Sequence, residues 1–176
     1  IMKDIAALHN ITNTRLLKEY FLLLMERSAK QMSINKIAKI LSISPDTSRR
    51  YLDLFADTFL IHVLNRSGKT NEKTLSPKKT YAADNGIRCL FTGHRDYGSL
   101  FENYVYLKIK HLSPEYIYQN GIEIDFLIKD ILIECKYHQE ELSGKQKDLF
   151  NALNFPEKKV VRNDKDIDSL LEFEKR

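Results

Sequence analysis

The sequence predicts a mixed α/β protein, α+β overall, with a helical module in residues 1–83 and a layered α/β domain in residues 84–176. Three observations predict this division. Apolar residues recur at helical spacing through most of residues 11–55, which is typical of amphipathic helices. Residues 122–137 alternate between polar and apolar on both sides of a short turn, as in a β-hairpin. From residue 99 onward the order is helix, three strands, helix, strand and helix, which favours α/β layers.

The composition is that of a folded protein with a mild positive charge. Hydrophobic residues make up 43% of the 176 residues and charged residues 30%, so the chain can bury a core. Lys and Arg number 28 against 24 Asp and Glu, a balance that permits nucleic-acid binding without requiring it. No apolar run approaches the ~18 residues of a membrane span, and no secretory signal is present. Cys89 and Cys135 lack metal-site spacing, so we expect a reduced cytoplasmic protein without membrane association.

Three consecutive helices are predicted in the N-terminal module. The first covers residues 11–29, with a cap at Asn13 or Thr14, and the second begins after Ser33. The third opens at Ser44-Pro45-Asp46 and runs to about residue 55. Serine is a natural N-cap, proline suits the first helical position, and an acid favours the positive end of a helix. The short turn between the last two helices gives the spacing of a helix-turn-helix.

Two strands joined by a basic loop follow the third helix. The strands are predicted at residues 59–64 and 80–83, and residues 65–79 between them carry five Lys and Arg against one acid. A helix-turn-helix followed by such a loop predicts a winged helix, whose cations would neutralise the phosphates of DNA. A winged helix that binds a protein is the alternative. The candidate nucleic-acid contacts are Arg49, Arg50, Arg66, Lys69, Lys73, Lys78 and Lys79.

One carboxylate of the second half is placed beside apolar neighbours. After a short helix opened by Asp84-Asn85-Gly86, a longer helix is predicted over residues 99–112. Glu102 shares its flank with apolar residues three, four and seven positions later, where burial of a charge is costly without a partner. The alternative is a glutamate near the start of a helix that interacts with the helix dipole.

The hairpin brings two acids and a lysine to one face. Its two-residue turn at Lys129-Asp130 sets the register, so Asp125 lies opposite Glu134, with Lys136 two residues further on. Two carboxylates across a strand pair have Cβ atoms roughly 5 Å apart and repel each other. A divalent cation between them would remove that repulsion, because hard cations prefer carboxylate oxygens. The alternative is a solvated sheet face on which Glu123 and Lys136 form an ordinary cross-strand pair.

The same alternation assigns the apolar residues of the hairpin to faces. Ile124, Phe126 and Ile128 are predicted on one face, and Leu127 and Leu132 on the face of the carboxylates. A strand at residues 116–119 precedes the hairpin through an Asn120-Gly121 turn, which is a strong hairpin signal. A helix at residues 143–153, a strand at 158–161 and a helix at 166–174 complete the predicted domain.

Asp125, followed after a turn by Glu134-Cys135-Lys136, resembles the acidic core of the PD-(D/E)xK nuclease superfamily, whose fold is restriction-endonuclease-like. Over roughly residues 10–155 the chain also resembles the C-terminal half of an AAA-type ATPase family that carries the domain DUF4143. Ile124 stands where many nucleases of this superfamily have proline. The matching segments are Ile37-Ala38, Arg50-Tyr51-Leu52, Lys79-Thr80-Tyr81, Asp84-Asn85-Gly86, residues 98–105, 123–126 and 133–136.

This resemblance implies a winged helix followed by a nuclease-like domain that hydrolyses phosphodiesters. It implies Mg²⁺ or Mn²⁺ held by Asp125, Glu134 and Glu102, with Lys136 and Gln119 as further catalytic residues. It also implies DNA as a partner, an ATPase domain in the same longer chain, and an oligomer formed through that ATPase. The chain lacks a Gly-rich phosphate loop, so ATP would bind outside it, and its start within a helical lead-in is expected for a piece of a longer protein.

A catalytically silent role is the second hypothesis. A nuclease-like fold without activity would bind DNA or a protein partner and regulate the parent ATPase. The acid pair with Lys136 favours catalysis. The moderate net charge of +4 and a third helix with only two obvious basic residues on its outer face favour the silent module.

Overall fold

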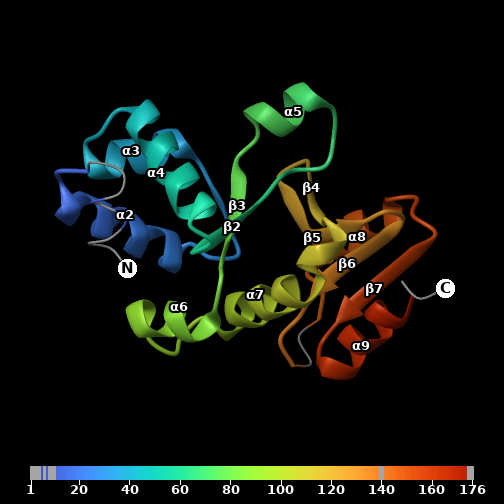
Figure 1. The fold of residues 1–176 in the computed structure, drawn as a ribbon. Helices are drawn as coiled ribbons and strands as arrows, with labels where there is room; N and C mark the ends of the chain where they lie inside the picture. The colour runs from blue at the N-terminus through green and yellow to red at the C-terminus, as the bar shows by residue number, and fades with distance from the viewer. Residues whose placement is uncertain (1–4, 6, 8–10, 139–140, 174–176) are drawn as a thin grey trace. The chain divides into compact units, whose positions relative to one another are not determined.

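The computed structural model describes residues 5, 7, 11–138 and 141–173 and has a mixed α/β fold (Figure 1). In that part of the chain eight α-helices accompany two β-sheets. The chain forms two compact units. The first contains the described residues up to Val63 together with Pro77–Arg95, and the second contains Leu64–Ser76 and the described residues from Asp96 onward. None of the described helices combines the length and the apolar character needed to cross a membrane.

The observed division differs from the single boundary expected near residue 84 in two respects. The helix after that point, α6 (Asn85–Thr92), packs on α2 (Thr14–Glu26) and belongs to the first unit. The segment Leu64–Ser76 leaves the first unit and joins the second before the chain returns. Local sequence pattern gives no sign of either crossing, because both depend on which distant surface the segment contacts.

The first unit contains the three predicted helices, and the caps predicted for the first and the third are confirmed. Besides α2 and α6, it consists of β1 (Lys30–Met32), α3 (Ile34–Leu41), α4 (Pro45–Asp57), β2 (Ile61–Leu64) and β3 (Lys78–Ala82). The side chains of Asn13, Ser33 and Ser44 accept the backbone N–H groups that start α2, α3 and α4. The strand β1 was not predicted, and it pairs antiparallel with β3 in a sheet of order β1-β3-β2.

The core of the first unit lies between α2 and α4. Tyr20 packs edge-on against Tyr51 and stacks on Phe55. The Tyr20 hydroxyl donates to the carbonyl of Ser48 at 2.6 Å, so the buried phenol is satisfied where the two helices meet. Burial raises the pKa of Tyr20 to about 12. These contacts fix the orientation of α4 and therefore which of its residues face solvent.

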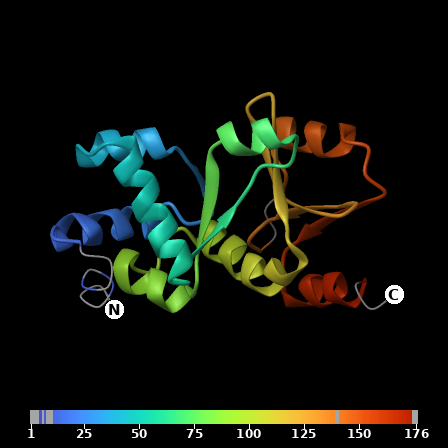
Figure 2. The ribbon, with the colours of Figure 1, turned by 45° about the horizontal axis from the view of Figure 1, so that its top comes forward.

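The second unit is built around a four-stranded sheet of order β4-β5-β6-β7. Pairing is antiparallel between β4, β5 and β6, and parallel between β6 and β7. Figure 2 shows α8 on one face of this sheet and α7 and α9 on the other. The predicted order of helix, three strands, helix, strand and helix is confirmed. Its elements are α7 (Tyr97–Ile109), a 3₁₀ turn (Lys110–Leu112), β4 (Glu115–Gln119), β5 (Ile122–Ile128), β6 (Ile131–Cys135), α8 (Gly144–Ala152), β7 (Glu157–Val161) and α9 (Asp164–Phe173).

The loop predicted as a basic wing lies along the second sheet. It contains a short helix, α5 (Thr70–Leu75). The Ser67 N–H donates to the carbonyl of Tyr116 at 2.7 Å, and the Tyr116 N–H donates to the carbonyl of Asn65 at 3.1 Å. Lys73 forms an ion pair with Glu115. The segment therefore protects the edge of β4, because its backbone satisfies groups that would otherwise be unpaired.

The hairpin has the predicted register at its turn and an irregularity further along. Phe126 pairs with Ile133, and Ile128 with Ile131, as predicted. Towards β4, Glu115 pairs with Leu127 but Ile117 pairs with Ile124, so two residues of β5 lie opposite one residue of β4. This β-bulge at Asp125 and Phe126 reverses the alternation of faces along β5.

The bulge makes one sequence prediction wrong. Ile124 was placed on the face of Phe126, but it packs with Leu132 and with Leu149 and Phe150 of α8. Phe126 faces the other side, where its ring stacks on Tyr106 of α7. An extra residue in one strand shifts the side-chain period by one, and nothing in the alternating sequence marks its position.

Candidate active site

The carboxylates of Asp125 and Glu134 meet inside the second unit. Asp125 is 7% exposed and Glu134 1% exposed. The Cys135 N–H donates to Asp125 Oδ2 at 2.9 Å, and the Asp125 N–H donates to Glu134 Oε2 at 3.3 Å. Each carboxylate thus binds a backbone N–H of the neighbouring strand, just beyond the point where the regular ladder of β5 and β6 ends. The bulge in β5 positions Asp125 for this exchange, as bulges near functional sites often do.

Lys136 completes the predicted trio. Its Nζ lies 3.0 Å from Glu134 Oε1. Its backbone N–H donates to the carbonyl of Val161 at 2.9 Å, so β7 anchors the chain directly after β6. The structure therefore brings together the two acids and the ammonium that the sequence placed on one face, and their catalytic role stays a prediction.

Gln146, on the first turn of α8, is a site residue that sequence reasoning missed. Its Nε2 donates to Glu134 Oε1 at 2.6 Å and to the carbonyl of Glu123 at 3.2 Å. The helix start is fixed because the Ser143 hydroxyl accepts the Gln146 N–H. Glu134 Oε1 is thus bound by both an amide and an ammonium. No local signal could have identified this glutamine, since a polar residue on the first turn of a helix is ordinary.

The electrostatics of the site disfavour two ionised acids. Burial raises the pKa of Glu134 to about 9, and the negative charge of Asp125 adds to that effect. Lys136 lowers the pKa of Glu134 without overcoming the two larger causes, and Glu102 raises it further. Without an added cation, the ionised form of Glu134 is therefore disfavoured. A site in which burial and neighbouring acids raise the pKa of a carboxyl group has the electrostatics of a cation-binding or acid–base site.

The two other predicted site residues differ in their placement. Glu102 is half-buried on α7, close enough to raise the pKa of Glu134. Gln119 is the last residue of β4, is exposed beside the turn, and takes part in none of the contacts above. Within residues 11–138 and 141–173 and at residues 5 and 7, no three His, Cys, Asp or Glu side chains gather closely enough to hold a metal ion by themselves.

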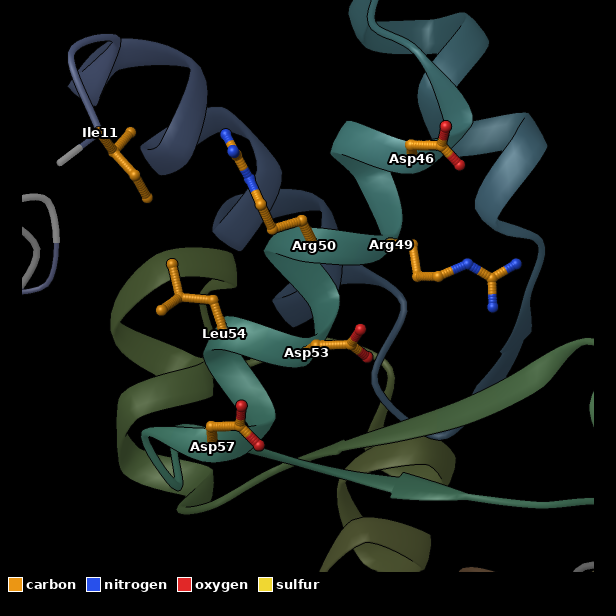
Figure 3. Close-up of a pocket in the computed structure, with 7 residues that line it drawn as sticks. All are labelled: Ile11, Asp46, Arg49, Arg50, Asp53, Leu54 and Asp57. Carbon is orange, nitrogen blue, oxygen red and sulfur yellow. The ribbon is translucent and has the colours of Figure 1, made fainter. Parts of the chain in front are cut away.

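The outer face of α4 carries the predicted Arg49 and Arg50 among acids. Figure 3 shows the two guanidinium groups pointing to different sides of the helix, with aspartates before and after them. A hollow of about 350 Å³ opens along this face. Arginines that alternate with aspartates do not form the single-sign surface on which phosphate binding depends. The hollow is lined by Ile11, Asp46, Arg49, Arg50, Asp53, Leu54 and Asp57.

The remaining predicted nucleic-acid contacts are divided between the two units. Lys79 is fully buried in β3, so its prediction as a phosphate contact is wrong, because strand pairing and packing enclose its side chain. Lys78 is partly buried, and burial together with Arg49 lowers its pKa. Arg66, Lys69 and Lys73 belong to the second unit.

The chain belongs to the family described as "Domain of unknown function (DUF8612)", which matches residues 1–97. It is also similar to "Uncharacterized protein MJ1544" of Methanocaldococcus jannaschii, with 32% identity over 149 residues. That match covers 76% of this chain and 33% of the relative, so the chain spans about a third of the curated relative's length. No solved structure matches the chain.

The family corrects the resemblance inferred from the sequence. DUF8612, and not DUF4143, is the family that matches, and none of the findings includes an AAA-type ATPase. The short segments that suggested DUF4143 lie in the helices α3, α4 and α7, in the strand β3, at the start of α6 and in the hairpin of β5 and β6. The ATPase partner, the ATP site outside the chain and an oligomer formed through the ATPase lose their basis with that resemblance.

Proposed function

We propose that the second unit is a metal-dependent phosphodiester hydrolase acting on nucleic acid, with Asp125 and Glu134 as the acids and Lys136 as the cation of its site. The buried carboxylate pair carries the proposal. Burying two like charges is expensive, and a chain that needed only a stable hairpin would place apolar or oppositely charged residues there. The raised pKa of Glu134 expresses this cost.

The arrangement of elements supports a finer fold assignment. We propose that the second unit is restriction-endonuclease-like, because α7, the antiparallel strands β4 to β6, α8 and the parallel strand β7 follow one another as that fold requires. We propose that the first unit is a winged helix-turn-helix, because β1 lies between α2 and α3 and pairs with β3. Fold alone does not assign chemistry, so the function is argued from the carboxylate pair.

The donor set fits Mg²⁺ or Mn²⁺. Hard cations bind carboxylate oxygens, and Mg²⁺ usually keeps several waters and binds through one or two carboxylates together with substrate phosphates. Asp125 and Glu134 would supply two such groups, and Glu102 would act through a water. When bound, the ion would lower the pKa of a bound water and neutralise charge on the phosphate.

The chain's own residues have distinct tasks in this proposal. Lys136 holds a positive charge 3.0 Å from Glu134 Oε1, where it can orient a water or stabilise the charge that develops on the phosphate. Gln146 is a positioning residue, because its two hydrogen bonds hold one oxygen of Glu134 and one strand carbonyl at fixed places. Rigid support of this kind is what metal-binding carboxylates require.

The test is a cleavage assay with labelled DNA and RNA in Mg²⁺ or Mn²⁺. We expect the wild-type protein to cleave, and Asp125→Asn and Lys136→Ala to lose at least about 100-fold in rate. Calorimetry with Mn²⁺ should show binding to the wild type and not to Asp125→Asn. Cleavage that survives in both variants would place the activity elsewhere and overturn the assignment.

A catalytically silent module is the second candidate. It is favoured by the absence of a third liganding group beside the acid pair among the described residues and by the mixed charge of the α4 face. Such a module would bind DNA or a protein partner. A folded protein that neither cleaves nucleic acid nor binds Mn²⁺ at millimolar concentration would establish this candidate over the first.

A further inference from the structure

We propose that stacked aromatic side chains beside the carboxylate pair bind an unpaired nucleobase, so that the substrate is a single strand or an unpaired end. The aromatic platform consists of Tyr97, Phe101, Tyr137 and His138. Binding by the platform can be measured without cleavage, while its role in choosing the substrate rests on the proposed function.

The platform consists of one stacked pair of rings with two further rings tilted against it. The rings of Tyr97 and Tyr137 have centroids 5.6 Å apart and planes inclined by 14°. Phe101 leans on Tyr137 at 5.9 Å and 54°. On the chain after Tyr137, the His138 ring lies 3.9 Å away. The near-parallel pair of tyrosines is the offset-stacked arrangement that aromatic rings prefer.

The platform is built on the same two segments as the candidate active site. Phe101 directly precedes Glu102 on α7, and Tyr137 directly follows Lys136 after β6. The Asp96 side chain caps α7 by accepting the Ser99 N–H at 3.3 Å, and this fixes Tyr97 in the first turn. The Lys136 N–H bond to Val161 fixes the chain before Tyr137. The rings and the site residues therefore come from neighbouring positions of the same two segments.

Tyr97 leaves a ring surface open to a ligand. Its side chain is 53% exposed although Tyr137 stacks against it. A ring that is exposed and already oriented can extend a stack with little further loss of conformational freedom. Exposed aromatic surface beside a polar site is more informative than exposed surface elsewhere, because it points to a ligand with a flat apolar face.

A nucleotide with an unpaired base is the ligand that fits both the candidate active site and the aromatic platform. In a duplex the faces of the bases are already stacked on one another, so only an unpaired base offers a free face without the cost of extrusion. Stacking of a base on an aromatic side chain is tolerant of sequence and changes affinity by about 5- to 150-fold per base. The inference is therefore a preference for strand state and not for sequence.

The test uses the absence of tryptophan from the chain. Tyr97→Trp creates a single fluorescent reporter on the platform, and Leu75→Trp places a control reporter on the exposed end of α5. Each variant is titrated in EDTA with an oligothymidylate, with the same strand in a duplex, and with an abasic strand of equal length. We expect quenching of the Tyr97→Trp reporter by the oligothymidylate alone, and no base-dependent change of the Leu75→Trp reporter.

Affinity measured by anisotropy completes the test. Tyr97→Ala should weaken single-strand binding by about 5- to 150-fold, while Tyr97→Phe, which keeps the ring, should bind as the wild type does. Equal quenching by the abasic strand, or unchanged affinity of Tyr97→Ala, would overturn the platform. If base-dependent quenching is present but no cleavage occurs in Mg²⁺ or Mn²⁺, the platform stands and the hydrolase proposal fails. Cleavage without base-dependent quenching would overturn the platform and leave the hydrolase proposal standing.

Discussion

The carboxylate pair of the second unit and the outer face of α4 in the first unit place charged side chains in opposite environments. Asp125 and Glu134 are buried. Arg50 and Asp53, which lie three residues apart on α4, are exposed. Exposed mixed charges cost little and contribute little to stability. Buried like charges cost much, and the raised pKa of Glu134 is the sign of that cost. In this protein, charged side chains therefore indicate a function where their burial costs free energy of folding.

The sharpest test of this comparison replaces one aspartate by asparagine in each of the two regions. Asp125→Asn should abolish Mn²⁺ binding or weaken it by at least about 100-fold, because it removes a charged oxygen donor from a buried pair. Asp53→Asn, on the exposed face of α4, should bind Mn²⁺ as the wild type does. Isothermal titration calorimetry measures both, with circular dichroism as the control for folding. Equal losses in the two variants would mean that the ion binds non-specifically to acidic surface.

Loss of the hydrogen bonds that support the Glu134 carboxylate should have the next largest effect on metal binding. Gln146→Ala removes both hydrogen bonds that α8 supplies, and we expect a loss of about 10- to 100-fold in metal affinity, as for other residues that orient a ligand. Gln119→Ala is the matched control, since that glutamine is exposed at the end of β4. Mn²⁺ titrations of the two variants compare them directly. A larger effect at Gln119 would restore the assignment made from the sequence and remove the role of α8.

The pH dependence of stability gives a test without any metal. The pKa of Glu134 is raised from 4.5 to about 9, so between these values the folded protein holds a proton that the unfolded chain releases. Stability must then fall as pH rises through this window. We expect Glu134→Gln to raise the melting temperature near pH 8 by several degrees and to flatten its dependence on pH.

Thermal unfolding in EDTA across this pH range is the measurement. Glu141→Gln, which changes an exposed glutamate of the same unit, is the control and should leave the curve unchanged. A lower melting temperature for Glu134→Gln at pH 8 would show that the ion pair with Lys136 outweighs the burial of the acid. The carboxylate pair would then be a structural feature.

Which parts of this structure were predictable depends on the range of the interactions involved. Helix starts such as Ser44 and the turn at Lys129-Asp130 follow from contacts within a few residues, and the sequence predicted both. The convergence of Asp125 with Glu134 followed from the same turn, because a two-residue loop sets the register. Short-range geometry was thus sufficient to predict the pair of acids at the centre of the candidate site.

The features that escaped prediction depend on distant partners. The bulge at Asp125 arises where β5 meets β4, and the alternating residues of β5 do not mark it. Lys79 was predicted to be a loop cation, but pairing of β3 with β1 and packing around it bury its side chain. Gln146 contacts Glu134 only because α8 crosses that face of the sheet. The bulge and Gln146 concern the surface against which a correctly predicted element packs, whereas Lys79 was assigned to a loop although its strand begins at Lys78.

The smallest expected effect tests the α4 face itself. If its aspartates offset its arginines, Arg49→Ala combined with Arg50→Ala should weaken binding to duplex DNA by less than about threefold, because few phosphates are neutralised there. Replacing Asp46, Asp53 and Asp57 by asparagine should instead strengthen binding and steepen its salt dependence. Anisotropy titrations at several salt concentrations measure both. A loss of tenfold or more in the arginine variant would show that α4 contacts the duplex despite its acids, and exposed charge would then have to be weighed by its geometry as well as by its sign.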